Sequence, residues 1–319
     1  MARALAGLLV DPVNGAVPGL LRIAGGRIEA VERDDSVDEL IRIFPGFVDL
    51  HVYDTENIVE DGVTTFLKAT RRADEEPGEL GAGLHLEGPF LNPDAAGAIP
   101  VDELRPVDLD LLASWLEGPV RLVTISPELT GALDAVALVA EHGAVAAIGH
   151  THANARTTRA AIDAGARFAT HLWNAMAPAK ARSTGPVPEL LLDERVTLGL
   201  IADGRHLHPR MEELTVRVAG PGRVALTSDR VEHPAHGPDG KLLGGDRAGA
   251  ALVARMARFG LQEAAAMASL VPARLLGLED RGRLAPGFRA DLAVLDAELD
   301  PVETIVAGET AWTVRYPQT

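Results

Sequence analysis

The chain has 319 residues, 47% of them hydrophobic, which is enough to bury one large core beside a small accessory domain. Its formal net charge of −16 argues against nucleic acid or an anionic membrane as the main partner, because both require clustered lysine and arginine. No cysteine is present, which excludes disulfides, thiolate catalysis and cysteine-ligated metals.

The first 44 residues predict a small antiparallel meander. Short apolar runs alternate there with turn signals such as Asn14-Gly15. The apolar run at residues 4–10 is too short for a signal sequence or a membrane span. We therefore expect a soluble, cytoplasmic protein that does not bind membranes.

From residue 45 to about residue 280, the pattern of strand, turn and helix repeats. Near-continuous apolar strands separated by helices predict an α/β fold, a (β/α)8 barrel of the TIM type. On that fold the chemistry lies at the C-terminal ends of the strands. The eight predicted strands are residues 47–51, 64–67, 83–86, 120–125, 145–148, 168–171, 197–201 and 224–227, and the main predicted helices are residues 133–141, 156–164, 211–218, 247–259 and 262–269.

The last part of the chain returns to strands and turns, at residues 290–295, 304–306 and 312–314. We expect these strands to pair with the first meander. The predicted organisation is a small β-sandwich domain built from both chain termini, residues 1–44 and 281–319, beside a metal-dependent barrel at residues 45–280.

Three residues of metal-ligand type close three of the predicted barrel strands: Glu87, His150 and His171. Two neutral imidazoles and one carboxylate, with a fourth position for water, form a recurring catalytic zinc arrangement. A strand-end Glu taken alone is usually a solvated charge. The three together favour a metal site, because the carboxyl ends of barrel strands meet at one face.

Two further polar residues follow barrel strands in the same way. Asp229 closes the eighth strand, where it is placed to carry a proton between water and a leaving group; the alternative is the N-cap of the next segment. His206 either hydrogen-bonds the reacting carbonyl or is a loop histidine tied to backbone.

Five stretches of the chain resemble the successive signatures of N-acetylglucosamine-6-phosphate deacetylases, a branch of the amidohydrolase superfamily. The His-Leu-Glu-Gly-Pro and His-Leu-aromatic-Asn-Ala-Met strings are the most specific, and the resemblance covers nearly the whole chain. The stretches are GLHLEGPF at residues 83–90, IGHTHA at 148–153, THLWNAM at 170–176, IADGRH at 201–206 and MASLVPARLLGL at 267–278.

The resemblance implies a role for each matching residue. Glu87, His150 and His171 would hold one divalent metal, for which zinc is expected. Asp229 would act as general base and then general acid, and His206 would polarise the acetamide carbonyl. The phosphate site would be formed by Asn174, the backbone at Ala175 and Arg182, and since the arginine of this family comes from a neighbouring subunit, a homodimer is implied.

The chain also departs from the family pattern. Where many members carry His-x-His, it has His51-Val52-Tyr53, so we expect one metal and leave open whether His51 or Tyr53 touches it. Ile99 stands where the family has a histidine that binds the sugar. The loops after Tyr53 and Asp229 are short, and Arg230, His233 and His236 lie in the trimmed second one.

The most direct interpretation is metal-dependent hydrolysis of N-acetylglucosamine 6-phosphate to glucosamine 6-phosphate and acetate. A deacetylase of the same fold that acts on a different or larger N-acylated amino sugar is the alternative, which Ile99 and the short loops favour. A sugar-phosphate-binding protein without catalysis is a third hypothesis, and the complete set of candidate catalytic residues argues against it.

Overall fold

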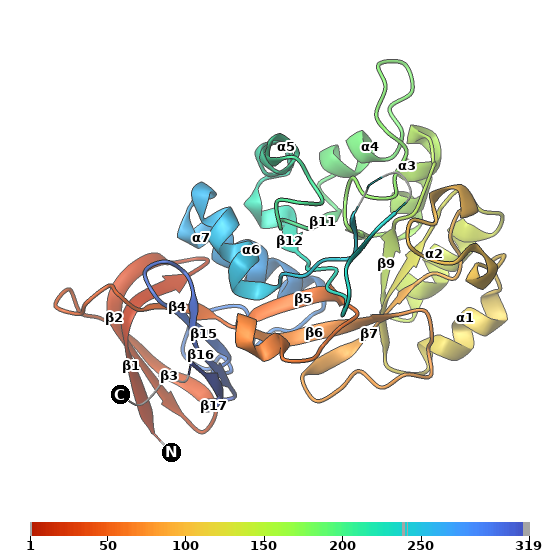
Figure 1. Cartoon of the computed structure of the whole chain (residues 1–319). Helices are drawn as coiled ribbons and strands as arrows, with labels where there is room; N and C mark the ends of the chain where they lie inside the picture. Colours follow the sequence, from red (N-terminus) through yellow and green to blue (C-terminus); the bar gives the residue numbers. More distant parts are fainter. Residues whose placement is uncertain (1, 238–239, 241, 315–319) are drawn as a thin grey trace. The chain divides into compact units, whose positions relative to one another are not determined.

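Eight strands lie in sequence order in one sheet, as a parallel barrel requires, and this confirms the predicted fold class (Figure 1). The structure is a computed structural model that describes residues 2–237, 240 and 242–314. The hydrogen-bonded pairs from β7 to β12 are parallel. The strands are β5 (Phe47–Val52), β6 (Val63–Thr70), β7 (Gly81–Glu87), β8 (Val120–Ile125), β9 (Val145–Ile148), β10 (Phe168–Ala169), β11 (Thr197–Leu200) and β12 (Val224–Leu226).

The ends of the barrel sheet meet through the residues that follow β5 and β12. The backbone N–H of Asp229 donates to the carbonyl of His51 at 3.0 Å, and Val52 forms a parallel bridge with Arg230. The first and eighth strand ends are thereby held side by side. A candidate catalytic residue, Asp229, is fixed by its own backbone at this junction.

All five of the main predicted helices are present, although the last is divided between α7 and a π-helical segment. Helix α3 begins after Asn154, whose side chain accepts from the backbone N–H of Thr157, and α5 begins with Pro209, which needs no backbone donor there. The helices are α1 (Leu109–Leu116), α2 (Ala132–Glu141), α3 (Ala155–Ala164), α4 (Val187–Leu192), α5 (Pro209–Ala219), α6 (Gly249–Met256), α7 (Leu261–Ala265) and α8 (Val271–Leu275).

Short helical turns complete these elements: η1 (Ile58–Asp61), η2 (Pro93–Ala95), η3 (Val101–Glu103), η4 (Pro221–Arg223), η5 (Ala257–Phe259) and the π-helical η6 (Ala266–Leu270). Strands β7 to β11 and helices α1 to α4 share an apolar core that includes Leu86, Val123, Ile148 and Ile162. Helices α1 and α4 were not among the predicted elements.

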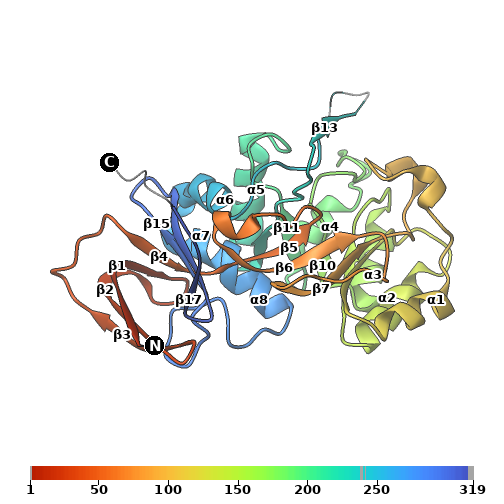
Figure 2. The ribbon, with the colours of Figure 1, turned by 60° about the horizontal axis from the view of Figure 1, so that its bottom comes forward.

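The two chain ends contribute to one seven-stranded sheet, as predicted. Its strand order is β17-β16-β15-β4-β1-β2-β3, so strands from both termini are neighbours (Figures 1 and 2). Buried Leu9, Ile43, Leu292 and Ile305 belong to its core. The strands are β1 (Arg3–Asp11), β2 (Gly15–Ala24), β3 (Arg27–Arg33), β4 (Arg42–Pro45), β15 (Leu292–Leu295), β16 (Pro301–Val306) and β17 (Glu309–Thr313).

The chain forms two units, which divide at β5, β6 and the residue after Asp246. One unit comprises Met1–Asp49, Thr55–Phe66 and Arg247–Thr319, and the other comprises Leu50–Asp54 and Leu67–Asp246. The second unit also contains a small hairpin of β13 (Ala235–His236) and β14 (Leu242–Leu243). The domain boundaries at 44/45 and 280/281 stay a prediction. Within the described ranges, no helix is both long and apolar enough to cross a bilayer.

Candidate active site

The three predicted metal ligands meet at the carboxyl ends of the barrel strands. The Oε1 atom of Glu87 lies 2.9 Å from Nε2 of His150 and 2.9 Å from Nε2 of His171. The two imidazole Nε2 atoms are 3.1 Å apart. All three side chains are buried. Residues 21 to 84 positions apart in the sequence therefore form one triangle of ligand atoms.

The chemistry of this triangle fits a small divalent cation. Nδ1 of His150 lies 2.8 Å from the carbonyl of Ala95 and donates to it, so Nε2 of the neutral ring presents a lone pair to the Glu87 carboxylate. Acceptors that face one another are mutually repulsive unless a proton or a cation lies between them. With metal–nitrogen bonds of about 2.0–2.1 Å, neighbouring ligand atoms lie about 2.9 Å apart in octahedral and about 3.3 Å apart in tetrahedral geometry. The observed distances fall at the lower end of this interval.

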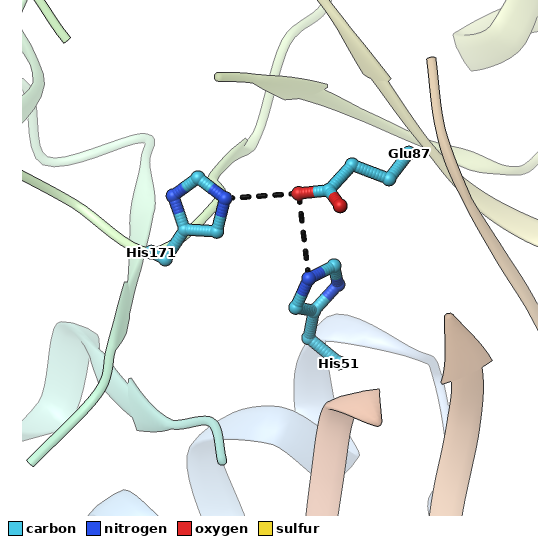
Figure 3. Close-up of side chains that lie close together, drawn as sticks. All are labelled: His51, Glu87 and His171. Atoms are coloured by element: carbon cyan, nitrogen blue, oxygen red, sulfur yellow. Dashed lines mark hydrogen bonds and ion pairs between the residues drawn. The ribbon is translucent and has the colours of Figure 1, made fainter. Parts of the chain in front are cut away.

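His51 and Tyr53 both adjoin this carboxylate, in different ways. Nε2 of His51 lies 3.4 Å from Glu87 Oε1 (Figure 3). The same atom is 3.2 Å from Asp229 Oδ1, so His51 lies between two carboxylates. Tyr53 instead donates its hydroxyl to the other Glu87 oxygen, Oε2. The structure therefore groups His51, Glu87 and His171 within metal-binding distance of one another, whereas Tyr53 orients the carboxylate.

The electrostatics of the site favour positive charge. Burial lowers the pKa of His51, but Glu87 and Asp229 outweigh it and raise that pKa to about 10. Burial raises the pKa of Tyr53 well above its ordinary value, and the charge of Glu87 adds to the effect, so the phenol stays a hydrogen-bond donor. The negative groups that hold a proton on His51 would equally attract a metal cation.

A buried histidine that the sequence did not single out supports the cluster from within the barrel. His85 lies two residues before Glu87, with Nδ1 at 2.9 Å from both the Leu50 carbonyl and Nδ1 of His51. Its Nε2 atom lies 2.7 Å from the hydroxyl of Thr124. Burial and the neighbouring His51 hold the pKa of His85 well below its usual range. His85 is therefore a neutral support for His51.

Asp229 lies at the cluster and does not begin a helix. Its Oδ1 atom is 3.2 Å from Nε2 of His51. The next residue, Arg230, bridges to Val52 and Gly245, so the N-cap alternative does not hold. Arg230 forms an ion pair with Asp54 at 3.2 Å. Asp229 also lines the same cavity as the ligand triangle.

His206 is held by a carboxylate three residues before it. Its Nδ1 atom lies 2.8 Å from Asp203 Oδ2, while Oδ1 of Asp203 accepts from the backbone N–H groups of Arg205 and His206. Burial raises the pKa of Asp203, but these hydrogen bonds outweigh burial and bring it to about 2. Nε2 of His206 is buried without a hydrogen-bond partner in the described chain. This free nitrogen suits a ligand oxygen better than it suits a purely structural role.

One cavity of about 1140 Å³ is lined by Glu87, His150, His171, His206 and Asp229, together with Asn174 and Ala175. The amide of Asn174 also donates to the carbonyl of His171 at 3.3 Å. Ile99, which is only 5% exposed, and His236 belong to the same wall. His233 lies in the same segment after Asp229, where it is exposed and pairs with Glu232. The cavity thus joins the candidate metal site to the candidate phosphate loop.

Arg182 is not brought to this cavity by its own chain. It is exposed on a tight hairpin in which Lys180 and Ser183 exchange backbone hydrogen bonds at 3.1 Å. The loop between β10 and α4, which contains this hairpin, extends away from its surroundings in Figure 1. Arg182 is therefore exposed and does not line the described cavity.

Several site residues have a strained backbone. His150, His171, Asp229 and Ala175 have φ angles of 48°, 33°, 49° and 51°, in the left-handed region. A non-glycine residue there costs of the order of 1–3 kcal/mol and persists only when the surrounding structure holds it. Three of the four predicted strand-end residues are among them, which supports a functional reason for the strain.

A parallel eight-stranded barrel with a carboxylate and histidines at its carboxyl ends defines the class of protein: an amidohydrolase. A sequence model of the amidohydrolase family matches residues 204–312. The N-acetylgalactosamine-6-phosphate deacetylase of Escherichia coli O157:H7 is 34% identical over 263 residues, 74% of this chain and 69% of that protein.

Two solved structures extend the similarity to almost the whole chain. N-acetylglucosamine-6-phosphate deacetylase of Thermotoga maritima has a TM-score of 0.90 and 28% identity, covering 98% of this chain and all of the other. A point mutant of the Mycobacterium smegmatis enzyme in complex with N-acetyl-D-glucosamine-6-phosphate has a TM-score of 0.86 and 30% identity, covering 97% of this chain and 99% of the other. The chain belongs to the N-acetylglucosamine-6-phosphate deacetylase family.

Proposed function

We propose that the protein hydrolyses the acetamide of N-acetylglucosamine 6-phosphate to give glucosamine 6-phosphate and acetate. The observation that carries this proposal is the triangle of Glu87, His150 and His171 with Asp229 and His206 in the same cavity. The related Mycobacterium smegmatis structure, which contains N-acetyl-D-glucosamine-6-phosphate, supports the choice of substrate.

Glu87, His150 and His171 would hold one divalent ion, and we propose zinc because two imidazoles and a carboxylate suit it. The chemistry that such an ion supplies is Lewis-acid activation of water and of a carbonyl oxygen. Tyr53 keeps Glu87 in position by donating to its second oxygen. The ring of His85 contacts Nδ1 of His51 through its own Nδ1 and helps to hold that ring in place.

In this proposal Asp229 transfers the proton, and His206 stabilises the negative charge that develops on the acetamide oxygen. Asp229 accepts a proton from the attacking water as the oxygen bonds to the acetyl carbon, and it delivers that proton to the amine nitrogen as the C–N bond breaks. His206, whose Nδ1–H donates to Asp203, directs Nε2 at the acetamide oxygen and donates to it when both ring nitrogens carry a hydrogen. A single donor of this kind is worth about 10² to 10³ in rate.

We propose that Asn174, the backbone at Ala175 and Arg182 of a second copy of the chain bind the phosphate. A guanidinium fork binds two phosphate oxygens at once. Arg182 is exposed on the hairpin that Lys180 and Ser183 close, which supports a contact with another copy. A homodimer follows from this assignment. We further propose that the enzyme is cytoplasmic, where a sugar phosphate is retained.

A deacetylase of the same fold with a different or larger N-acylated amino sugar as its substrate is the second candidate. Two observations favour it: Ile99 forms an apolar part of the cavity wall, and the cavity of about 1140 Å³ slightly exceeds the range of about 300–1,000 Å³ that is usual for small-molecule sites. Arg230, which follows Asp229, forms an ion pair with Asp54.

Metal analysis and acetate release on a small substrate panel distinguish the candidates. The panel contains N-acetylglucosamine 6-phosphate, its galacto epimer, unphosphorylated N-acetylglucosamine and a sugar nucleotide. One equivalent of metal with the highest kcat/KM on N-acetylglucosamine 6-phosphate supports the proposal. Metal with turnover of the sugar nucleotide alone supports the second candidate, and binding of the phosphates without acetate release contradicts both.

A further inference from the structure

Glu128 is a carboxylate in the loop between β8 and α2, outside the set of residues that the family resemblance assigns. It accepts three hydrogen bonds from two other loops. Its Oε1 atom accepts from Asn92 Nδ2 at 2.7 Å and from the backbone N–H of His152 at 2.6 Å. Its Oε2 atom accepts from the hydroxyl of Thr151 at 2.5 Å. Both loops lead directly to candidate metal ligands.

The first of these loops begins at His150. This residue is held with φ of 48°, a conformation that the residues around it must enforce. Glu128 fixes the next two residues, Thr151 and His152, through the bonds described above. Thr151 also bridges to the candidate phosphate loop: its N–H donates to the Ala175 carbonyl at 2.9 Å, and its own carbonyl accepts from Ala177 at 2.9 Å.

The second loop follows Glu87 and contacts the imidazole ring of His150. Asn92 donates its amide to Glu128 and accepts from the backbone N–H of Asp94 at 2.9 Å, which caps the turn η2. The last residue of that turn, Ala95, offers its carbonyl to Nδ1 of His150 at 2.8 Å. That bond fixes the ring orientation and leaves Nε2 as the ligand atom.

Glu128 therefore acts on His150 from two directions: through the backbone behind it, and through Asn92 and the turn that binds its ring. A neighbouring contact supports the same arrangement, because Ser126, two residues earlier, donates its hydroxyl to the His150 carbonyl at 2.5 Å. A carboxylate offers acceptor positions on both oxygens, whereas the amide of glutamine replaces one of these oxygens with an NH₂ donor. The three donors therefore match a carboxyl side chain better than an amide.

We infer that Glu128 is a positioning residue of the metal site, which keeps His150 in its ligating orientation and ties it to the Asn174–Ala175 loop. This inference rests on the metal site of the proposed function. Removal of such a supporting contact typically weakens metal binding or activity about 10- to 100-fold. Glu128→Ala is expected to weaken metal affinity within this interval, and Glu128→Gln by a smaller factor, because an amide retains one acceptor oxygen.

The test measures zinc affinity by chelator competition for the wild type, Glu128→Ala, Glu128→Gln and a control, Glu141→Ala, at the exposed end of α2. The visible spectrum of the cobalt-substituted proteins is recorded in parallel, since it reports ligand geometry and a loss of general stability would leave it unchanged. Affinity should fall in the order wild type, Gln, Ala, with an altered cobalt spectrum, while the control matches wild type.

A Glu128→Ala protein with affinity and cobalt spectrum equal to those of wild type would overturn the inference. If that variant does not fold, Thr151→Val and Asn92→Ala each remove one hydrogen bond to Glu128, and each is expected to weaken zinc binding. Wild-type zinc affinity in both of these variants would also overturn the inference. A wild type that binds zinc but releases no acetate contradicts the proposed function alone. A wild type that binds no metal contradicts both.

Discussion

Replacing Asp203 with Asn should destabilise the protein by an amount that depends on pH. The carboxylate is buried and accepts from the His206 ring and from two backbone N–H groups. Although burial raises its pKa, these bonds bring it from the ordinary 3.8 to about 2. Since one pKa unit corresponds to about 1.4 kcal/mol, the folded state gains about 2 kcal/mol from this group at pH 7.

The sign follows from the lowered pKa. The contribution is complete above about pH 4, falls to roughly half at pH 3 and is lost as the pH passes through about 2. Urea unfolding of the metal-free wild type and Asp203→Asn should therefore differ by about 2 kcal/mol at pH 7 and by about 1 kcal/mol at pH 3. The same variant should lower kcat, because His206 loses the group that orients it.

A matched control is Asp246→Asn, which removes an exposed ion pair with Arg205 in the same region. Such a pair contributes less than about 1 kcal/mol. A difference between the wild type and Asp203→Asn that stays constant from pH 7 to pH 3 would refute the reasoning, since it would mean that the Asp203 carboxylate is not stabilised in its charged form. Equal effects of the two substitutions at pH 7 would refute it too.

Three further substitutions test other parts of the site. Asp229→Asn should abolish acetate release and leave zinc content at the wild-type level, and retained turnover would remove Asp229 from its role as proton carrier. Tyr53→Phe loses the hydrogen bond to Glu87 and should weaken zinc binding about 10-fold in a chelator competition; unchanged affinity would contradict its orienting role. Equal amounts of Arg182→Ala and Asp229→Asn chains, after subunit exchange, should recover about a quarter of wild-type activity, because half of the dimers are mixed and each has one complete site. No recovery would argue against Arg182 acting across the dimer.

The barrel and its ligand-bearing strand ends were predictable because their signals are local. A parallel strand buried on both faces is a continuous apolar run, and a polar residue at its end is conspicuous. Glu87, His150, His171 and Asp229 all stand at such ends, and the fold then requires them to face one another. Even the short strand β10, which comprises only Phe168–Ala169, is enough to place His171 at the strand ends.

The supporting residues were not predictable, because their roles depend on which loops meet in space. Glu128 contacts partners 36 and 24 positions away, and nothing in its neighbouring sequence marks it as an acceptor for both. His85 reads as one polar residue within an apolar strand, although it faces His51. Asp203 stands in a recognised string, but only the folded loop shows that it holds His206.

Two helices were missed for a different reason. Helix α4 has six residues, too few to display a helical period, and it begins beside Pro186. Helix α1 has eight, and its N-cap Asp108 follows a proline-containing stretch that reads as a loop. Neither helix carries a site residue, so the active-site prediction did not depend on them.

The central claim is tested most directly by a crystal structure of the zinc-loaded protein with anomalous scattering recorded at the zinc edge. One anomalous peak is expected within about 2.0–2.2 Å of Glu87 Oε1 and of the Nε2 atoms of His150 and His171. A zinc-saturated crystal with no peak among these three atoms, or with its peak bound by other residues, would contradict it.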